Sequence, residues 1–324
     1  MNRPMLFRLA AALPLAALAA CGPRPAPAPS PSPAPPPSAA ADARPAPQII
    51  SEKPELGPVR PYRVPPVEEL RLANGLRVVL VRQTTMPLVT ARLIVEAGAE
   101  YEPAEKNGLA VLTASLLPEG TQTMTGPELA ERMERLGAQF QTGAGQNAAF
   151  VVVTGLKSVF GEALGLAAST VLAPGFAERE FERVRGQAIA GHVQAQSTVE
   201  GLATEAFNRA LFAAEAPYAR PPGGTAPTLR GITRDDVLGW HRQMYAPANS
   251  TLLLVGDLTA AEARTLAERA FGAWSGAGAS RARPANAARP VARTRVILVD
   301  RPGSVQSTLR IGHRAPERAT PDYV

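Results

Sequence analysis

The chain has 324 residues, of which 45% are hydrophobic and 19% are charged, and its formal net charge is +6. This length predicts about two domains. A single cysteine excludes a disulfide framework, and the confinement of long apolar runs to the N-terminus excludes a polytopic membrane protein. Arginine alternates with acidic residues, and no basic cluster holds interleaved aromatic residues, so we expect no nucleic-acid partner.

Residues 1–21 are predicted to be a lipoprotein export signal. Two arginines precede the apolar stretch 9–20, which is too short to cross a bilayer. The run Leu-Ala-Ala-Cys that ends at Cys21 resembles the bacterial lipobox, in which the cysteine is acylated and then becomes the mature N-terminus. The resemblance implies a lipid anchor at Cys21, and Gly22 after it implies the outer membrane, facing the periplasm. The alternative is an ordinary signal peptide with an incidental cysteine.

Residues 22–66 are predicted to be a disordered, partly polyproline spacer. About half of the 33 prolines fall in this segment, together with alanine, serine and few large apolar side chains. Such a composition buries too little apolar surface to offset the entropy of ordering. We expect the spacer to hold the folded region away from the membrane.

The folded region is expected to begin at residue 67 with a β-hairpin. Asn74-Gly75, between the apolar segments 70–72 and 76–82, is a strong hairpin signal. Further strands are expected at 89–97, within 137–147 and at 148–154, and helices at 108–117, 126–136 and 157–172. In the second of these helices, apolar residues recur at helical spacing and predict a core-facing side.

The second half of the folded region is predicted to be mainly helical. Helices are expected at 177–196, 199–213, 233–245 and 260–271, and strands at 250–255, 295–299 and 307–312. Thr233 and Asp236 have the spacing of a capping box, and Thr259 is the expected cap of the last helix.

These elements divide into a first domain and the start of a second. The first domain is expected at 67–275, and a linker rich in Gly, Ala, Arg and Pro at 276–292 leads to an incomplete domain at 293–324. A stub of roughly 35 residues cannot bury a core of its own. We therefore expect the sequence to be a piece of a longer protein.

Three stretches of the sequence resemble the insulinase/pitrilysin-type zinc peptidases, a family that includes the mitochondrial processing peptidase. They are LANGLRVVLVRQTTMPLVTARLIVEAGAEYEPAEKNGLA (72–110), APYARPPGGT (216–225) and WHRQMYAPANSTLLLVGDLTAAEARTLAERAFGAW (240–274). The resemblance covers about 67–324. It implies an α+β fold with a mostly antiparallel sheet packed against helices on one face, followed by the truncated start of a second similar domain.

The resemblance also implies a zinc site, from which this sequence departs. Active members carry His-x-x-Glu-His on the first helix, where two histidines one turn apart bind zinc and the glutamate is the general base. Aligned on the flanking glycines, the ligand positions are Val111 and Ser115, and the base position is Ala114. The third ligand, a glutamate in the family, falls near Ala190 and Gly191. We therefore expect no catalytic residue, no metal and no cofactor in this chain.

Histidine is too rare to form a zinc site elsewhere. The three histidines are His192, His241 and His313, and no two of them are three to five residues apart. His192, beside the third-ligand position, is either a lining residue of the former cavity, an adventitious metal contact or a surface side chain, and we favour the last. His241 is expected to be structural. Ser115 as a nucleophile would need a base and an orienting acid, and no nucleophile motif surrounds it.

The resemblance leads to three functional hypotheses. The first is a non-catalytic pseudoenzyme that forms a heterodimer with an active zinc-bearing homologue, since members of the family work in pairs of which one subunit holds the zinc. The second is a peptide-binding or scaffold lipoprotein with no peptidase partner. The third, an active zinc endopeptidase, requires ligands that the sequence lacks.

Peptide binding in the first hypothesis is assigned to an edge strand. In the family, a peptide or unfolded polypeptide is added to this edge through main-chain hydrogen bonds, which do not need the metal. The candidate contacts are Gln139, Gln141, Gly143, Gln146 and Asn147.

Overall fold

The computed structural model describes residues 57, 65–276, 278, 284, 285, 287, 289, 293–313, 315, 320 and 321. All helices and strands among them belong to one unit, Tyr62–Val324. The predicted export signal with Cys21, nearly all of the spacer 22–66 and most of the linker 276–292 lie outside the described residues. Among the described helices, none combines the length and the apolar character needed to span a bilayer.

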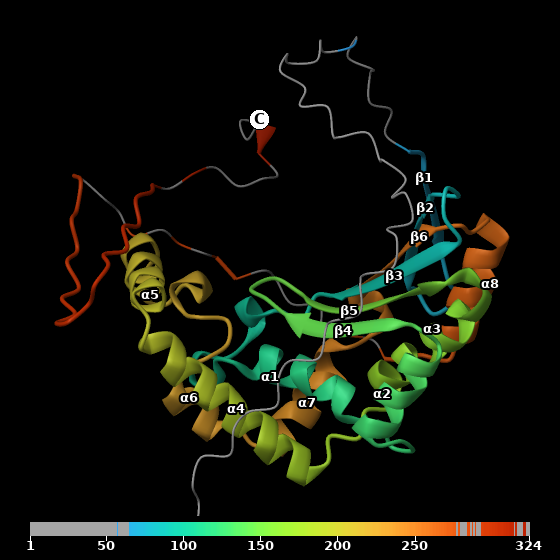
Figure 1. The fold of residues 1–324 in the computed structure, drawn as a ribbon, viewed down its shortest axis with the longest axis horizontal. Coiled ribbons are helices and arrows are strands. Elements are labelled where there is room, and N and C mark those ends of the chain that lie inside the picture. Colours follow the sequence, from blue (N-terminus) through green and yellow to red (C-terminus); the bar gives the residue numbers. More distant parts are fainter. Residues whose placement is uncertain are drawn as a thin grey trace, which may run out of the picture. The chain divides into compact units, whose positions relative to one another are not determined.

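A six-stranded sheet forms one layer of the fold (Figure 1). Its strands are β1 (Val67–Arg71), β2 (Arg77–Arg82), β3 (Leu88–Val95), β4 (Gln139–Ala144), β5 (Ala149–Leu156) and β6 (Ser250–Gly256). They lie in the order β1-β2-β6-β3-β5-β4. All neighbouring strands are antiparallel except β2 and β6, which are parallel. The last of these strands in the sequence, β6, is therefore near the centre of the sheet, and β4 is at an edge.

The helices form the other layer. They are α1 (Leu109–Leu116), α2 (Gly126–Arg135), α3 (Lys157–Leu172), α4 (Glu178–Gln196), α5 (Val199–Leu211), α6 (Ala226–Gly231), α7 (Arg234–Met244) and α8 (Ala260–Phe271). Helices α2, α6, α7 and α8 each begin at a threonine whose side chain forms a capping box. The predicted caps at Thr233 and Thr259 are confirmed.

The apolar core lies between the sheet and the helices, the two layers that Figure 1 shows as ribbons. Alternate residues of β3, among them Val89, Leu93 and Val95, are buried, because successive strand residues point to opposite faces of a sheet. They belong to one core cluster with side chains of the helix layer, including Leu112 of α1 and Phe160 of α3. The prediction of an α+β fold with a mostly antiparallel sheet is confirmed.

The two strands predicted near the C-terminal end are wrong. Residues 295–299 and 307–312 lie within 293–313, a described segment that forms no helix and no strand. Val296 and Leu298 are 92% and 90% exposed. A strand is stable only when a neighbour satisfies its backbone hydrogen bonds, and this segment has no strand partner among the described residues.

Candidate functional site

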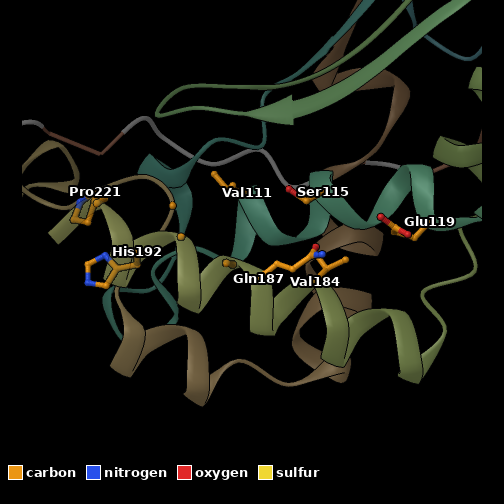
Figure 2. Close-up of a pocket in the computed structure, with 12 residues that line it drawn as sticks. Val111, Ser115, Glu119, Val184, Gln187, His192 and Pro221 are labelled. Atoms are coloured by element: carbon orange, nitrogen blue, oxygen red, sulfur yellow. The ribbon is translucent and has the colours of Figure 1, made fainter. Parts of the chain in front are cut away.

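A cavity of about 460 Å³ lies between α1 and α4, and we call it the α1–α4 cavity. Val111 and Ser115 of α1 line one side, and Val184, Gly191 and His192 of α4 line the other (Figure 2). The loop that precedes α6, residues 221–224, closes one end of the cavity through Pro221 and two glycines.

The helical period explains why these side chains meet. Val111 and Ser115 are four residues apart, so they share one face of α1. On α4, Val184, Ala188 and Gly191 follow each other at spacings of four and three residues and share the face that borders the cavity. One face of α1 and one face of α4 therefore build the site.

The structure brings three of the five degenerate motif positions to this cavity. Val111, Ser115 and Gly191 line it, whereas Ala114 is fully buried and Ala190 is an exposed residue of α4. Proteins bind zinc through thiolate, imidazole or carboxylate groups. An isopropyl group, a hydroxyl group and a glycine hydrogen supply none of these, so the residues at these positions do not fit a zinc ion. In the described part of the chain, no group of three His, Cys, Asp or Glu side chains could hold a metal.

The titratable side chains of the cavity are Glu119 and His192. Glu119 forms an ion pair with Arg183 of α4, which also binds Glu180 at 2.7 Å. His192 is half-buried and lines the cavity. From the sequence we favour a surface side chain, and the structure instead places His192 in the cavity wall. Glu119 was not predicted as a site residue, because it follows α1 in a short turn that no periodicity marks.

A buried carboxylate fixes the start of α1. Glu102 accepts hydrogen bonds from the backbone N–H of Gly108 at 2.8 Å, from that of Ala110 at 2.6 Å and from the side-chain amide of Asn107 at 3.2 Å. The first N–H groups of a helix lack partners within the helix, and a carboxylate there also interacts favourably with the helix dipole. Burial nevertheless raises the pKa of Glu102 to about 7, and these hydrogen bonds and the nearby Arg220 oppose that increase.

Two glycines bring the start of α1 against the loop 221–224. Gly108 has a φ of 103°, and a Cβ atom there would lie 2.9 Å from the carbonyl oxygen of Gly223. Gly224 has a φ of 77°, and a Cβ atom there would lie 2.4 Å from the carbonyl oxygen of Asn107. Only glycine combines a positive φ with such close backbone approach. The end wall of the cavity is therefore fixed by backbone contact.

The predicted peptide contacts divide into two groups. Gln139, Gln141 and Gly143 belong to the edge strand β4, and the two glutamine side chains are exposed. Gln146 and Asn147 lie beyond the strand, in the turn to β5. The amide of Gln146 donates to the carbonyl of residue 220 at 3.0 Å, and that of Asn147 donates to the hydroxyl of residue 218 at 2.6 Å. The placement of Gln146 and Asn147 on the edge strand is thus corrected, because their side chains brace the turn against the loop that follows α5.

Comparison with known protein families identifies the family of this chain. Residues 77–221 match the model of the insulinase family, peptidase family M16, and residues 231–324 match the model of the peptidase M16 inactive domain. The chain belongs to the peptidase M16 family. The solved structure of a peptidase M16 inactive domain from Pseudomonas fluorescens is 28% identical in sequence, with a TM-score of 0.65 over 68% of this chain and 54% of that one.

Two curated relatives in this family carry different descriptions. An uncharacterized zinc protease of Rickettsia bellii is 26% identical over 201 residues, which are 62% of this chain and 48% of the relative. The non-peptidase homolog YmxG of Helicobacter pylori is 24% identical over 173 residues, which are 53% of this chain and 40% of the relative. The chain thus spans about half the length of the curated relatives it matches.

Proposed function

We propose that this chain is a non-catalytic M16 protein that binds an extended peptide and pairs with an active zinc peptidase of the same family in the cell envelope. One observation carries the proposal. The α1–α4 cavity lies beside α1, the helix that carries the motif positions, but Val111, Ser115 and Gly191 have no side-chain groups that bind zinc. At the base position, the methyl group of Ala114 cannot take a proton from water. A relative described as a non-peptidase homolog supports this interpretation.

Peptide binding is the part of the family function that does not need the metal. Strand β4 pairs only with β5 and leaves its other edge without a strand partner among the described residues. An extended peptide could be added there through main-chain hydrogen bonds. Because β4 contacts α1, a side chain of that peptide would be directed towards the α1–α4 cavity, which has room for one large residue.

Pairing would supply the zinc-dependent catalysis that this chain lacks. In this proposal the partner holds zinc, and the present chain supplies the opposite wall of the chamber. Two walls orient an extended peptide better than one, so binding and orientation contribute to the rate. Acylated Cys21 would keep the pair at the outer membrane, on the periplasmic side.

A mixing experiment tests the proposal. The full-length protein, an active His-x-x-Glu-His homologue from the same cell, and their mixture are each assayed with a quenched peptide, alongside co-purification. The full-length protein alone should cleave nothing, and the mixture should cleave several-fold faster than the homologue. A mixture no faster than the homologue, with no complex formed, would remove the pairing proposal.

A cavity-filling variant makes the test specific to the α1–α4 cavity. Ser115→Phe places a ring in the cavity and should reduce the stimulation, because the peptide side chain loses its space. Ser158→Phe is the matched control, since Ser158 is exposed in the first turn of α3. Equal effects of the two variants would show that the cavity does not take part.

The second candidate function is a peptide-binding or scaffold lipoprotein without a peptidase partner. It rests on the same edge strand and the same cavity. Peptide binding by the isolated protein, together with failure to form any complex with the active homologue, would favour it over pairing.

A further inference from the structure

A second cavity, of about 440 Å³, lies at the C-terminal end of α7, and we call it the α7 cavity. Its apolar wall includes Leu172, Phe176, Leu238 and Trp274. It shares no lining residue with the α1–α4 cavity. It is therefore distinct from the site used in the proposed function.

The wall of the α7 cavity includes a tyrosine whose buried hydroxyl group lacks a hydrogen-bond partner. Tyr245 lines the cavity and is 3% exposed, and its hydroxyl has no partner among the described residues. Leaving a buried polar group without a partner is costly, and native proteins rarely do so. A phenolic hydroxyl can donate one hydrogen bond and accept others. A bound polar group would satisfy it.

The neighbouring histidine offers the complementary group. The Nε2 atom of His241 lies 2.9 Å from the carbonyl oxygen of Val171. A carbonyl can only accept, so Nε2 carries the proton. Burial lowers the pKa of His241 to about 4, so the ring is neutral near pH 7 and Nδ1 is left as an acceptor.

Aromatic rings surround both groups. The ring of His241 stacks on that of Tyr245, with a centroid distance of 4.8 Å, and meets the ring of Phe176 edge-on at 5.4 Å. Trp274 is held in place because the side-chain amide of Asn74 donates to its carbonyl oxygen at 3.0 Å. A flat ligand in the cavity would therefore contact side chains that are already ordered, at little entropic cost.

We propose that the α7 cavity binds a phenolic ring whose hydroxyl accepts a hydrogen bond from Tyr245 and donates one to His241, with its apolar body against Phe176, Leu238 and Trp274. Two sources supply this chemistry: a free small phenol and the tyrosine side chain of a polypeptide. The hydroxyl distinguishes the ligand from a purely apolar one, because it satisfies groups that a hydrocarbon would leave unpaired.

Calorimetric titration with p-cresol and with 4-methylanisole tests the site. The two probes share a ring and a methyl group, but the second has no hydroxyl to donate. We expect p-cresol to bind about tenfold more tightly, which corresponds to one net hydrogen bond. N-acetyltyrosinamide and N-acetylphenylalaninamide form the second arm. Preference for the tyrosine compound would indicate a polypeptide source, and binding of p-cresol alone would indicate a free phenol.

Two tyrosine variants locate the binding. Tyr245→Phe should also weaken p-cresol binding about tenfold, because the ligand then loses the other hydrogen bond, the one that Tyr245 donates. The melting temperature should stay unchanged or rise, because the variant removes only an unsatisfied hydroxyl. Tyr218→Phe, whose hydroxyl accepts from Asn147 in another part of the fold, is the matched control and should not change p-cresol binding. Equal affinities for p-cresol and 4-methylanisole, or unchanged binding in Tyr245→Phe, would overturn the proposal. So would the absence of any p-cresol binding.

Discussion

The hydroxyl group of Thr142 in β4 donates a 2.7 Å hydrogen bond to the backbone carbonyl of Ala114 in α1. The side chain of one residue thus joins the edge strand to the helix that carries the motif positions. The resemblance to active peptidases assigns the position of the general base to Ala114. Any displacement of the edge strand, for instance when a peptide is added, therefore acts directly on the wall of the α1–α4 cavity.

Replacement of Thr142 by valine should weaken this connection. The carbonyl of Ala114 keeps its hydrogen bond from the backbone N–H of Leu117, so no buried acceptor is left unsatisfied. We expect the free energy of unfolding to fall by about 1 kcal/mol, the net value of one hydrogen bond. Urea denaturation measures this, with Thr85→Val in an exposed loop as the control. A loss no larger than that of the control would show that the bond contributes nothing.

Zinc should be absent from the purified protein. The groups at Val111, Ser115 and Gly191 cannot form a ligand set, so metal analysis after dialysis should find no stoichiometric zinc. An active His-x-x-Glu-His homologue, dialysed in parallel, is the positive control. One tightly held zinc per chain that disappears in His192→Ala would contradict this expectation.

Substitution of Gly108 should damage the fold, whereas substitution of a matched glycine should not. Gly108→Ala introduces a Cβ 2.9 Å from the carbonyl oxygen of Gly223, at a φ of 103°. We expect a loss of about 2 kcal/mol or more. Gly165 lies in the exposed face of α3 with no atom near its added Cβ, so Gly165→Ala should stabilise by about 0.5–1 kcal/mol. Thermal unfolding of the two variants compares them, and equal melting temperatures would refute the backbone contact.

Ionisation of Glu102 should make stability depend on pH. Its pKa is about 7 in the folded protein and near 4.5 when unfolded. Between these values the folded state keeps a proton that the unfolded state has released, so this contribution is fully present below pH 4.5 and is lost as the pH rises through 7. The loss is on the order of 3 kcal/mol.

Comparison with Glu102→Gln isolates this effect. His241, whose lowered pKa gives a stability that increases with pH between about 4 and 6.5, contributes equally to both proteins and cancels in the difference. The stability of the original protein relative to the variant should therefore fall between pH 5 and pH 7.5. A constant difference across this range would show that Glu102 does not titrate there.

The anchor prediction concerns Cys21, which lies outside the described residues. If Cys21 is acylated, Cys21→Ser should abolish lipid labelling and release the protein from the membrane fraction. Deletion of residues 25–60 should leave the melting temperature unchanged, because the composition of this segment predicts a spacer without core contacts. Retention of Cys21→Ser in the membrane would remove the lipoprotein interpretation.

Local signals in the sequence predicted most of the elements. Asn74-Gly75 marked the first hairpin correctly, and the threonine caps marked the starts of two helices. These signals depend on a few neighbouring residues. The six-residue helix α6 was not predicted, since it is too short to show a helical period.

Long-range relationships were not predictable in the same way. No local pattern shows that β6 lies between β2 and β3, or that Asn147 contacts Tyr218, because both depend on segments far apart in the sequence. The segment 295–299 was predicted as a strand from its composition alone, and the prediction was wrong. A strand also needs a neighbouring strand, which local composition does not show. The cavity was predicted only to the extent that a family alignment placed Val111, Ser115 and Gly191 together.

The position of β6 has a consequence for the order of folding. The hairpin β1–β2 and the group β3–β5–β4 contact each other in the sheet only through β6. During synthesis, residues 67–156 emerge long before residues 250–256, so the two parts of the sheet cannot join until β6 has been made. Contacts over such sequence separations slow folding. Until β6 is made, the facing edges of β2 and β3 therefore lack their strand partner, and we expect chaperones that shield such edges to bind the nascent chain.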